Sequence, residues 1–391
     1  MKILMLAPQP FFQPRGTPFS VLGRLYALSR MGHSVDLVTY HRGDDVTIPN
    51  VRILRIVNIP FIKNVKVGPS LAKIPMDVAL FFKALYLLSV NRYDLLHTHE
   101  EAGFMGIAFK KMFRIPHLYD MHSSLPQQLH NFQFSRSRIL HKVFETLEKR
   151  TLRGADGVIT ICPDLYNYVE SLNVARNHRL IENVLDYASL FEPSDGELEH
   201  PLFSDPRLTD KIKLLYVGTF EPYQGIDLLI EGIGEVVGEI PSAHFLLVGG
   251  KPEQVARYRE QVSRSGRSDY VTFTGSVSPV VAERFVQFSD VLLSPRISGN
   301  NTPLKIYSYL RSGKPIVATR HITHTQVLDD SVAILTEATP KSFARGIIEA
   351  VKSKSRVRAM VRNAQRLAAQ KYSYEIYVKK LAELLDNMDT N

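Results

Sequence analysis

The sequence predicts an α/β fold made of parallel sheets, because short apolar runs of strand length alternate with longer helical segments along its 391 residues. This length allows two or three domains, each with a well-buried core. Hydrophobic residues make up 45% of the chain and charged residues 22%. These are values of a globular protein, so the composition excludes a largely disordered chain.

The first half of the chain contains five apolar runs of strand length, separated by helical segments. The strands are expected at 3–7, 35–39, 95–98, 117–120 and 157–161, and the helices at 20–31, 76–90, 102–113 and 139–152. Each crossover between parallel strands should be right-handed. This half is therefore expected to form one domain, at 1–188.

A polar, turn-rich segment follows at 180–206, where we place the linker. The alternation then repeats, with strands expected at 213–217, 243–248, 270–274, 291–294 and 316–319. The helices that fill this half are expected at 226–237, 253–263, 281–288, 304–311 and 341–353, with a last one at 374–388. A second domain is therefore expected at 189–371, followed by a C-terminal helix within 372–391.

The segment 294–319, SPRISGNNTPLKIYSYLRSGKPIVAT, indicates a ligand-facing loop, a helix and a buried strand in succession. Thr302 can cap the helix, and the backbone NH groups at its start are expected to be free to bind a phosphate. Arg296 and Lys305 place two cationic side chains nearby. An ordinary strand, loop and helix is the other interpretation of the same spacing.

This segment resembles the nucleotide-binding segment of the retaining glycosyltransferases of family four. The matching residues are Pro303, Lys305, Ser308, Tyr309, Leu310, Gly313, Lys314, Pro315, Val317 and Ala318. Further similar segments follow the family's order, namely the first forty residues, LLHTHEEAG, LYDMHSS, LIENVLD and LLYVGTFEPYQGIDLLIEGI. The resemblance implies the GT-B fold, in which two Rossmann-like domains face each other across a cleft and the C-terminal helix crosses back to the first domain. The first domain would bind the acceptor and the second the nucleotide-sugar.

The resemblance also implies which residues form the site. Those carried over as donor-binding are Gly16, Gly218, Thr219, Gln224, Gly249, Asn300, Asn301, Thr302, Pro303, Leu304 and Ser308. Those with an expected catalytic role are His122, Arg296 and Lys305, and those on the acceptor side are Arg15, His99, Glu100 and Asp120. In doubly wound folds ligands bind beyond the carboxyl ends of the strands, which is where the loops with these residues are expected. For Gly16 a plain turn is the competing interpretation.

Four positions depart from the family's pattern. Thr219 and Gln224 stand where most relatives carry an arginine and a lysine that stabilise the departing diphosphate. The family's two glutamates fall on Asn300 and Ser308, or the first on Ser298. The phosphate clamp must then come from Arg296, Lys305 and backbone NH groups, or the donor differs, or catalysis is weak. We interpret the chain as a divergent subfamily.

The histidine-bearing segments do not predict a metal site. His97 and His99 share one face of a strand, yet no third ligand at a fitting spacing accompanies them, so no zinc site is expected. His122 matches a family histidine that lines the cleft, and we favour it over His99, although a structural histidine is the competing explanation for each. Glu100, Glu101 and Asp120 are conceivable bases.

Net charge is +9, and residues 1–188 carry 23 Lys and Arg against 15 Asp and Glu. This surplus suits an acidic acceptor or an anionic membrane surface, with Lys110, Lys111 and Arg114, or Arg136, Arg138 and Lys142, as candidate contacts. Solvated helix faces are the other explanation. No motif that interleaves aromatic and basic residues is present, so nucleic acid is not an expected partner.

The chain is expected in the cytoplasm, peripheral to the inner face of the plasma membrane. Its single cysteine, Cys162, excludes an internal disulfide framework. The start of the chain reads as a buried strand rather than a signal peptide, and the apolar run 78–90 is too short to span a bilayer.

The resemblance implies a metal-independent retaining transferase that moves a hexose from a nucleotide-sugar, a co-substrate rather than a cofactor, to a glycan or lipid-linked acceptor. Two alternatives stay open: a catalytically weakened sugar-nucleotide-binding scaffold protein, and a sugar-nucleotide epimerase. A hydrolase is disfavoured, because no constrained acid pair and no G-x-S-x-G motif is present.

Overall fold

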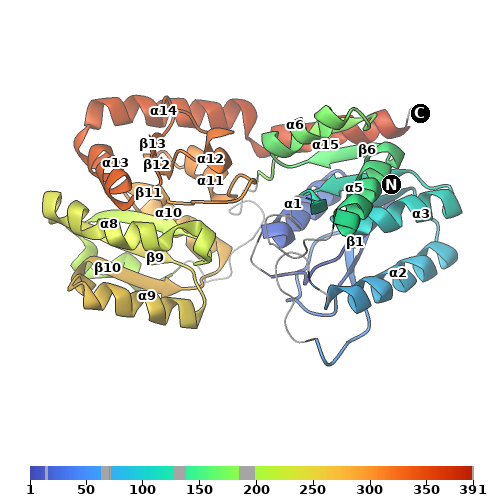
Figure 1. The fold of residues 1–391 in the computed structure, drawn as a ribbon, viewed down its shortest axis with the longest axis horizontal. Helices are drawn as coiled ribbons and strands as arrows, with labels where there is room; N and C mark the ends of the chain where they lie inside the picture. Colours follow the sequence, from blue (N-terminus) through green and yellow to red (C-terminus); the bar gives the residue numbers. More distant parts are fainter. Residues whose placement is uncertain (14–15, 63–69, 71, 127–137, 185–198, 390–391) are drawn as a thin grey trace. The chain divides into compact units, whose positions relative to one another are not determined.

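The computed structural model describes the chain except for residues 14–15, 63–69, 71, 127–137, 185–198 and 390–391 (Figure 1). The chain divides into two compact units. The first comprises Met1–Asn183 together with Glu375–Asn391, and the second comprises Val184–Tyr374. Each unit has its own parallel sheet with helices packed on it, as expected for a Rossmann-like domain.

The first unit contains a seven-stranded sheet in the order β3-β2-β1-β4-β5-β6-β7. Its strands are β1 (Lys2–Ala7), β2 (Ser34–Thr39), β3 (Val51–Arg55), β4 (Leu95–His99), β5 (His117–Met121), β6 (Gly157–Thr160) and β7 (His178–Leu180). Its helices are α1 (Gly16–Arg30), α2 (Lys73–Val90), α3 (Ala102–Phe113), α5 (Arg138–Gly154), α6 (Pro163–Leu172) and α15 (Tyr374–Asp389). All paired strands are parallel, so their carboxyl ends share one edge of the sheet.

The second unit contains a six-stranded sheet in the order β10-β9-β8-β11-β12-β13. Its strands are β8 (Ile212–Val217), β9 (Ala243–Val248), β10 (Val271–Gly275), β11 (Val291–Ser294), β12 (Ile316–Thr319) and β13 (Ile334–Thr336). Its α-helices are α8 (Ile226–Glu239), α9 (Pro252–Arg264), α10 (Pro279–Phe288), α11 (Lys305–Arg311), α12 (Ile322–Thr325), α13 (Pro340–Lys352) and α14 (Lys354–Lys371), and short 3-10 turns include η3 (Pro222–Gln224).

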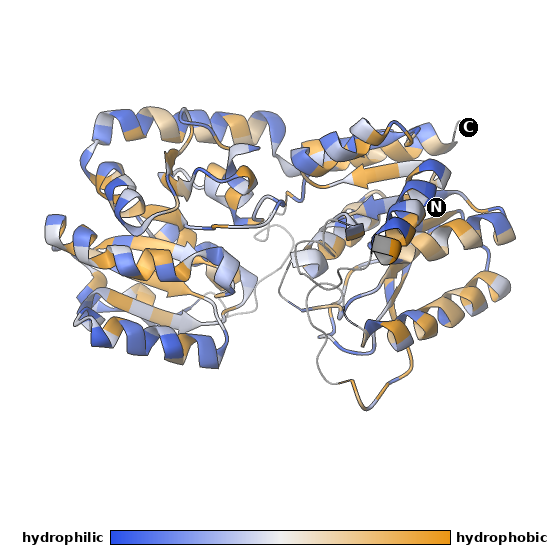
Figure 2. Ribbon diagram, in the orientation of Figure 1, coloured by the Kyte–Doolittle hydropathy of each residue, from blue (hydrophilic) through white to orange (hydrophobic). Residues whose placement is uncertain are grey.

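Burial on both faces explains why the central strands are almost wholly apolar. In β8, Leu214 and Tyr216 point to one face and join Phe245 and Leu247 of β9 in a hydrophobic cluster of the second unit. The helices that cover the sheet carry polar residues, and Figure 2 shows α9 mostly in the hydrophilic colour and α14 with both colours alternating. The loops that follow the strands at the carboxyl edge of each sheet are therefore anchored to a well-packed core.

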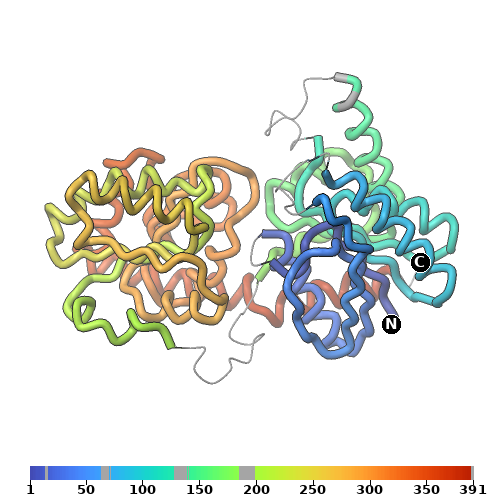
Figure 3. The backbone as a smooth tube through the Cα atoms, turned by 90° about the horizontal axis from the view of Figure 1, so that it is seen from below, coloured from blue at the N-terminus to red at the C-terminus, as the bar shows by residue number. Residues whose placement is uncertain are grey.

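The C-terminal helix α15 belongs to the first unit. Lys380 donates a hydrogen bond to Glu182 at 2.6 Å, and the guanidinium carbon of Arg24 lies 5.0 Å from the ring centroid of Tyr377. A Cβ on Gly157 of β6 would lie 2.6 Å from the sulfur of Met388, so α15 packs closely against this strand. Figures 1 and 3 both show α15, in red, beside the first unit's elements.

The predicted fold class is confirmed, with two Rossmann-like domains built from parallel sheets. The three short strands β3, β7 and β13 and the helices α6, α12 and α14 were not predicted. Residues 185–198, the middle of the expected linker, lie outside the described residues. The second unit starts at Val184.

Candidate active site

Both sheets reverse their strand order at one point, between β1 and β4 in the first unit and between β8 and β11 in the second. Loops that leave two such strands diverge, which opens a crevice at the carboxyl edge where ligands of doubly wound folds bind. Most of the predicted site residues lie in these loops or directly after β5. The predicted site residues form two groups, one in each unit.

In the second unit, three glycine-bearing loops meet at the carboxyl edge. A Cβ on Gly249, after β9, would lie 2.0 Å from the carbonyl oxygen of Gly218, after β8. A Cβ on Gly225 would lie 2.0 Å from the carbonyl oxygen of Pro295, after β11. All three glycines have positive φ, between 74° and 147°, which side chains rarely adopt. The backbones of the three loops are thus joined more tightly than any other residue would permit.

Lys305, the first residue of α11, reaches under the loop after β8. Its Nζ donates to the carbonyl oxygen of Val217 at 3.1 Å and lies 3.8 Å from the ring centroid of Tyr216. Burial first, and the charge of Arg296 second, hold the pKa of Lys305 well below its usual value. An anionic ligand beside this amine would stabilise its protonated form, so the buried Lys305 favours binding of an anion.

Arg296 is held by its own loop. Its Nε donates to the carbonyl oxygen of Ser298 at 2.9 Å, and its guanidinium carbon lies 5.0 Å from the ring centroid of Tyr223. The amide of Ile297 donates to the carbonyl of Tyr223 at 3.0 Å, which ties this loop to the one after β8. Arg296 and Lys305 therefore belong to one group, as the sequence predicts.

Three polar side-chain atoms of this group are buried without a hydrogen-bond partner among the described residues. They are Thr219 Oγ1, Gln224 Oε1 and Thr302 Oγ1. Buried polar groups are nearly always satisfied, so each such atom needs an explanation, and an absent ligand supplies one. All three had been predicted as donor-binding residues.

Other expectations for this segment were wrong. Thr302 does not cap α11, because the helix starts after Leu304 with no side-chain cap. The amides of Ile306 and Tyr307 are already bonded to the carbonyls of Pro303 and Leu304, so not all the amides at the helix start are available to a phosphate.

The remaining predicted donor-binding residues lie along the same loop and helix. The Ser308 hydroxyl donates to the carbonyl of Lys305 at 3.1 Å, which leaves only its lone pairs for a ligand. The Asn300 carbonyl accepts a hydrogen bond from Gln326 at 2.8 Å, and Asn301 follows it in the same loop.

In the first unit, a cluster of buried ionisable side chains forms at the ends of β4 and β5. Asp120 Oδ2 accepts a hydrogen bond from Arg24 Nε at 2.9 Å and lies 3.5 Å from His97 Nε2 and 3.8 Å from His99 Nδ1. Its Oδ1 lies 3.4 Å from His122 Nε2, which is hydrogen-bonded to His99 Nδ1 at 2.9 Å. The structure thus brings the predicted His99, Asp120 and His122 together.

Charge in this cluster is balanced by one ion pair. Burial would raise the pKa of Asp120, but Arg24 and the neighbouring histidines hold it well below its usual value. Burial, only partly opposed by Asp120, lowers the pKa of His122 to about 4 and that of His99 well below 6.5. Asp120 is therefore an anion between a cation and neutral imidazoles.

The expectation that no third candidate ligand stands beside the histidine pair was wrong. A carboxylate oxygen of Asp120 and a ring nitrogen of each of His97 and His99 lie within 4.8 Å of one another, because Asp120 comes from the neighbouring strand. Sequence spacing within one strand cannot show such a group. The Asp120 oxygen nearest both histidines already carries the Arg24 hydrogen bond, so the cluster has its cation.

Glu100 follows β4 in a left-handed conformation, with φ of 51°. It accepts a hydrogen bond from Ser123 at 2.8 Å, and burial together with the nearby Glu101 raises the pKa of Glu100 to about 7. Glu101 is paired with Lys73 at 2.9 Å. Of the two, Glu100 has the environment of a general base, because its proton exchanges near neutral pH.

The loop after β1 is described in part. Gly16 begins α1 with a φ of 25°, and a Cβ there would meet no atom within 4 Å. Arg15 lies outside the described residues.

Sequence reasoning missed three side chains of these groups: Arg24, Tyr216 and Tyr223. An arginine at an inward position of an otherwise apolar helix was a usable signal for Arg24. No sequence signal identifies which tyrosine ring will face a lysine from a distant loop.

Helix α2 of the first unit presents an unusual apolar stripe. Ile74, Val78, Phe82, Tyr86 and Val90 recur every four residues and are each between 50% and 64% exposed. Figure 2 shows this helix largely in the hydrophobic colour. Exposed apolar residues in one continuous patch mark an interaction surface.

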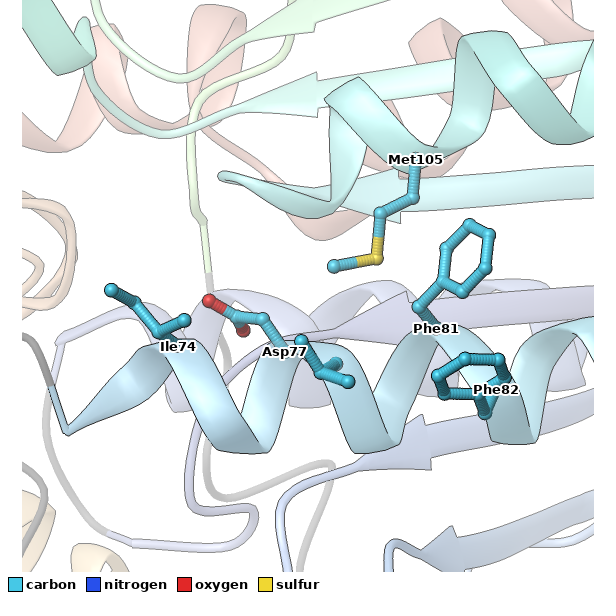
Figure 4. A pocket seen from close by; sticks show the side chains of 6 residues that line it. Ile74, Asp77, Phe81, Phe82 and Met105 are labelled. Atoms are coloured by element: carbon cyan, nitrogen blue, oxygen red, sulfur yellow. The ribbon is translucent and has the colours of Figure 1, made fainter.

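A pocket with a volume of about 360 Å³ adjoins this stripe (Figure 4). It is lined by Ile74, Asp77, Val78, Phe81, Phe82 and Met105. Its single carboxylate, Asp77, accepts a hydrogen bond from Tyr40 at 2.6 Å, and burial raises the pKa of Asp77 to about 7.

The basic clusters predicted for a membrane surface are partly used inside the fold. Lys110 pairs with Asp156 at 2.6 Å, whereas Lys111 and Arg114 are exposed at the end of α3. Arg136 lies outside the described residues, as does the side chain of Arg138. Among the helices that the structure describes, none combines the length and apolarity needed to cross a membrane.

Two family models match the chain. One described as "Glycosyltransferase Family 4" matches residues 20–188, and one described as "Glycosyl transferases group 1" matches residues 211–353. The sequence is 21% identical to phosphatidyl-myo-inositol mannosyltransferase of Mycobacterium leprae, over 100% of this chain and 98% of that protein. It is 19% identical to alpha-monoglucosyldiacylglycerol synthase of Acholeplasma laidlawii, over 96% and 94%.

Solved structures share the fold. Sucrose-phosphate synthase from Thermosynechococcus elongatus superposes with a TM-score of 0.76 at 21% identity, over 100% of this chain and 99% of that one. Anabaena HepE in complex with UDP and glucose superposes with a TM-score of 0.74 at 19% identity, over 99% of each chain. The likeness at such identities establishes the architecture, which is GT-B.

Proposed function

The chain belongs to the family 4 glycosyltransferases, and from this premise we propose that it transfers a hexose from a nucleotide-sugar to a glycan or lipid-linked acceptor, with retention of configuration. Glycosyl transfer follows from the family. We propose four further properties: a hexose as the transferred sugar, a glycan or lipid-linked acceptor, retention of configuration and a reaction without a metal ion. It is supported mainly by the group of Arg296, Lys305 and three unpartnered polar atoms in the second unit.

In this proposal the second unit binds the donor diphosphate. Lys305 and Arg296 supply the positive charge that stabilises the departing diphosphate, the task of a metal ion in other transferases. Thr219, Gln224 and Thr302 offer neutral hydrogen-bonding atoms, and the first two stand where most relatives carry charged groups. A UDP complex of the similar HepE supports a nucleoside diphosphate as the ligand class.

The first unit would orient the acceptor. A retaining transfer of this kind brings the acceptor hydroxyl to the same face that the diphosphate leaves, and the diphosphate oxygen can itself take up the hydroxyl proton. His122 would contact the sugar as a neutral imidazole. Glu100, with a pKa of about 7, is the alternative proton acceptor.

A lipid-linked acceptor is favoured by the apolar stripe of α2. We propose that the stripe and its pocket rest on an anionic membrane from the cytoplasmic side, with Lys111 and Arg114 at the headgroups. The relatives from M. leprae and A. laidlawii are named for transfer to a phosphatidylinositol and synthesis of a glycosyldiacylglycerol.

Turnover experiments separate the proposal from its alternatives. UDP-, GDP-, ADP- and TDP-hexoses are incubated with the protein, with and without membrane lipid extract, and product anomers are assigned by NMR. Transfer with retention supports the proposal. Binding of a nucleoside diphosphate without turnover would favour the scaffold protein, and donor interconversion without acceptor would favour the epimerase.

Membrane binding has a separate test. The double variant V78S/F82S should lose sedimentation with phosphatidylglycerol vesicles, whereas I322S, which removes an exposed apolar side chain of the second unit, should not. Equal sedimentation of both variants and the unmodified protein would remove α2 as the contact.

A further inference from the structure

Arg24 is a charged side chain in a place where packing alone would select an apolar one. It lies within α1, and its side chain is fully buried. Its Nε bonds to Asp120, and Tyr377 of α15 covers the guanidinium. Its Nη1 and Nη2 have no hydrogen-bond partner among the residues that the structure describes. Arginine stays protonated in proteins, so this is a permanent buried cation.

The cation faces a carboxylate that contacts three imidazoles. Asp120 lies within 3.8 Å of nitrogen atoms of His97, His99 and His122. With Arg24 present, the cluster is neutral when all three imidazoles are neutral. Without it, the buried carboxylate would have no permanent counter-charge, and the cluster would gain a proton to restore neutrality.

We propose that Arg24 is a positioning residue of the active site, which keeps Asp120 ionised and His122 a neutral imidazole whose Nε2 proton points into the cluster. His122 Nε2 has two acceptors within reach, Asp120 Oδ1 at 3.4 Å and His99 Nδ1 at 2.9 Å. This tautomer makes Nδ1 the basic nitrogen. The inference rests on the proposed function only in assigning His122 to the site.

The other ionisable groups around the cluster do not replace Arg24. From α15 Tyr377 presents the face of its ring, and β4 contributes only the two histidines. Glu100, after β4, is acidic and bonds to Ser123 beside His122. Among the described residues no second basic side chain other than histidine is recorded against Asp120.

The test compares R24M, R24K, D120N and R24M/D120N. Histidine ring signals are followed by NMR from pH 4 to 9, and donor turnover is measured over the same range. In R24M the titration of His122 should move upward from about 4 by roughly 1–3 units, and the acid limb of turnover should move with it. R24K should stay close to the unmodified protein because it keeps the cation.

The double variant distinguishes a positioning role from a structural one. R24M/D120N removes both charges, so the upward shift of the His122 titration expected in R24M should be largely lost in the double variant, because no buried carboxylate remains to stabilise the imidazolium. His244 of the second unit serves as an internal control whose titration should not change in any variant. If R24M does not fold, D120N is compared with R24M/D120N, and the His122 titration should lie lower in D120N, which keeps the cation.

Two results would overturn the inference. One is an unchanged His122 titration in folded R24M, and the other is a His122 titration in R24M/D120N that is no higher than in D120N. Turnover is read independently: a protein without any transfer activity would refute the proposed function, while the histidine titration would still report on Arg24.

Discussion

Replacing Lys305 by methionine should weaken nucleoside diphosphate binding and remove its pH dependence. Methionine keeps the aliphatic packing over Tyr216 but lacks the amino group that lies 3.8 Å from the ring centroid. A charge-assisted hydrogen bond contributes about 1.5–3 kcal/mol, so the dissociation constant should rise about 10- to 150-fold.

The pH dependence follows from the direction of the Lys305 shift. In the free protein, burial and Arg296 lower the pKa of Lys305, while a bound diphosphate favours the charged amine and raises it. Binding therefore takes up a proton between these two pKa values, and affinity falls as pH rises through that window. The same depression means that the unfolded chain binds more protons, so the Lys305 contribution to stability increases with pH below 10.5.

Titration calorimetry with UDP in two buffers of different ionisation enthalpy measures the proton uptake. The unmodified protein should take up as much as about one proton in this window, and K305M none. K213M is the matched control, because Lys213 lies on β8, the strand whose Val217 carbonyl Lys305 contacts, and it faces the ring of Phe288 at 5.4 Å and pairs with Asp290. Equal affinity and equal proton uptake in K305M and K213M would refute the reasoning.

Three further predictions concern stability and the unpartnered atoms. G249A should lower the free energy of unfolding by about 1–3 kcal/mol, because its φ of 119° is strained for alanine and the new Cβ would meet the Gly218 carbonyl. G238A should not lower it, because a Cβ on Gly238 would meet no atom within 4 Å. Urea titration measures both variants. T302V removes a buried hydroxyl that has no hydrogen-bond partner among the described residues, so the melting temperature should stay unchanged or rise. Nucleotide-sugar affinity, measured by calorimetry, should fall roughly 5-fold. Unchanged affinity would show that Thr302 does not contact the ligand. Burial and the charge of Lys211 lower the pKa of His244 to about 4, so the unfolded chain binds the extra proton and the free energy of unfolding falls as pH drops from 6.5 to 4. H244Q should flatten this slope by about 1.4 kcal/mol per pH unit in urea titrations at acid pH. An unchanged slope would contradict the lowered pKa.

Local sequence patterns were sufficient for the class of fold. The alternation of apolar runs with helical segments predicted most strands and helices within a few residues, because buried parallel strands must be continuously apolar. The short edge strands β3, β7 and β13 escaped, since three to five residues give little periodicity and their stability comes from pairing. Helix α14 escaped because it follows α13 without a glycine or proline between them.

The sequence by itself determined the two parallel-sheet domains, the family and the loop that carries Arg296, Lys305 and Thr302, since each depends on residues close together in the chain. The tertiary structure alone decided which side chains meet. It placed Arg24 against Asp120, 96 positions apart, and Lys305 under the loop of Val217, 88 positions away. Charge balance and burial depend on distances in space, and the spacing of residues along the chain does not determine these distances.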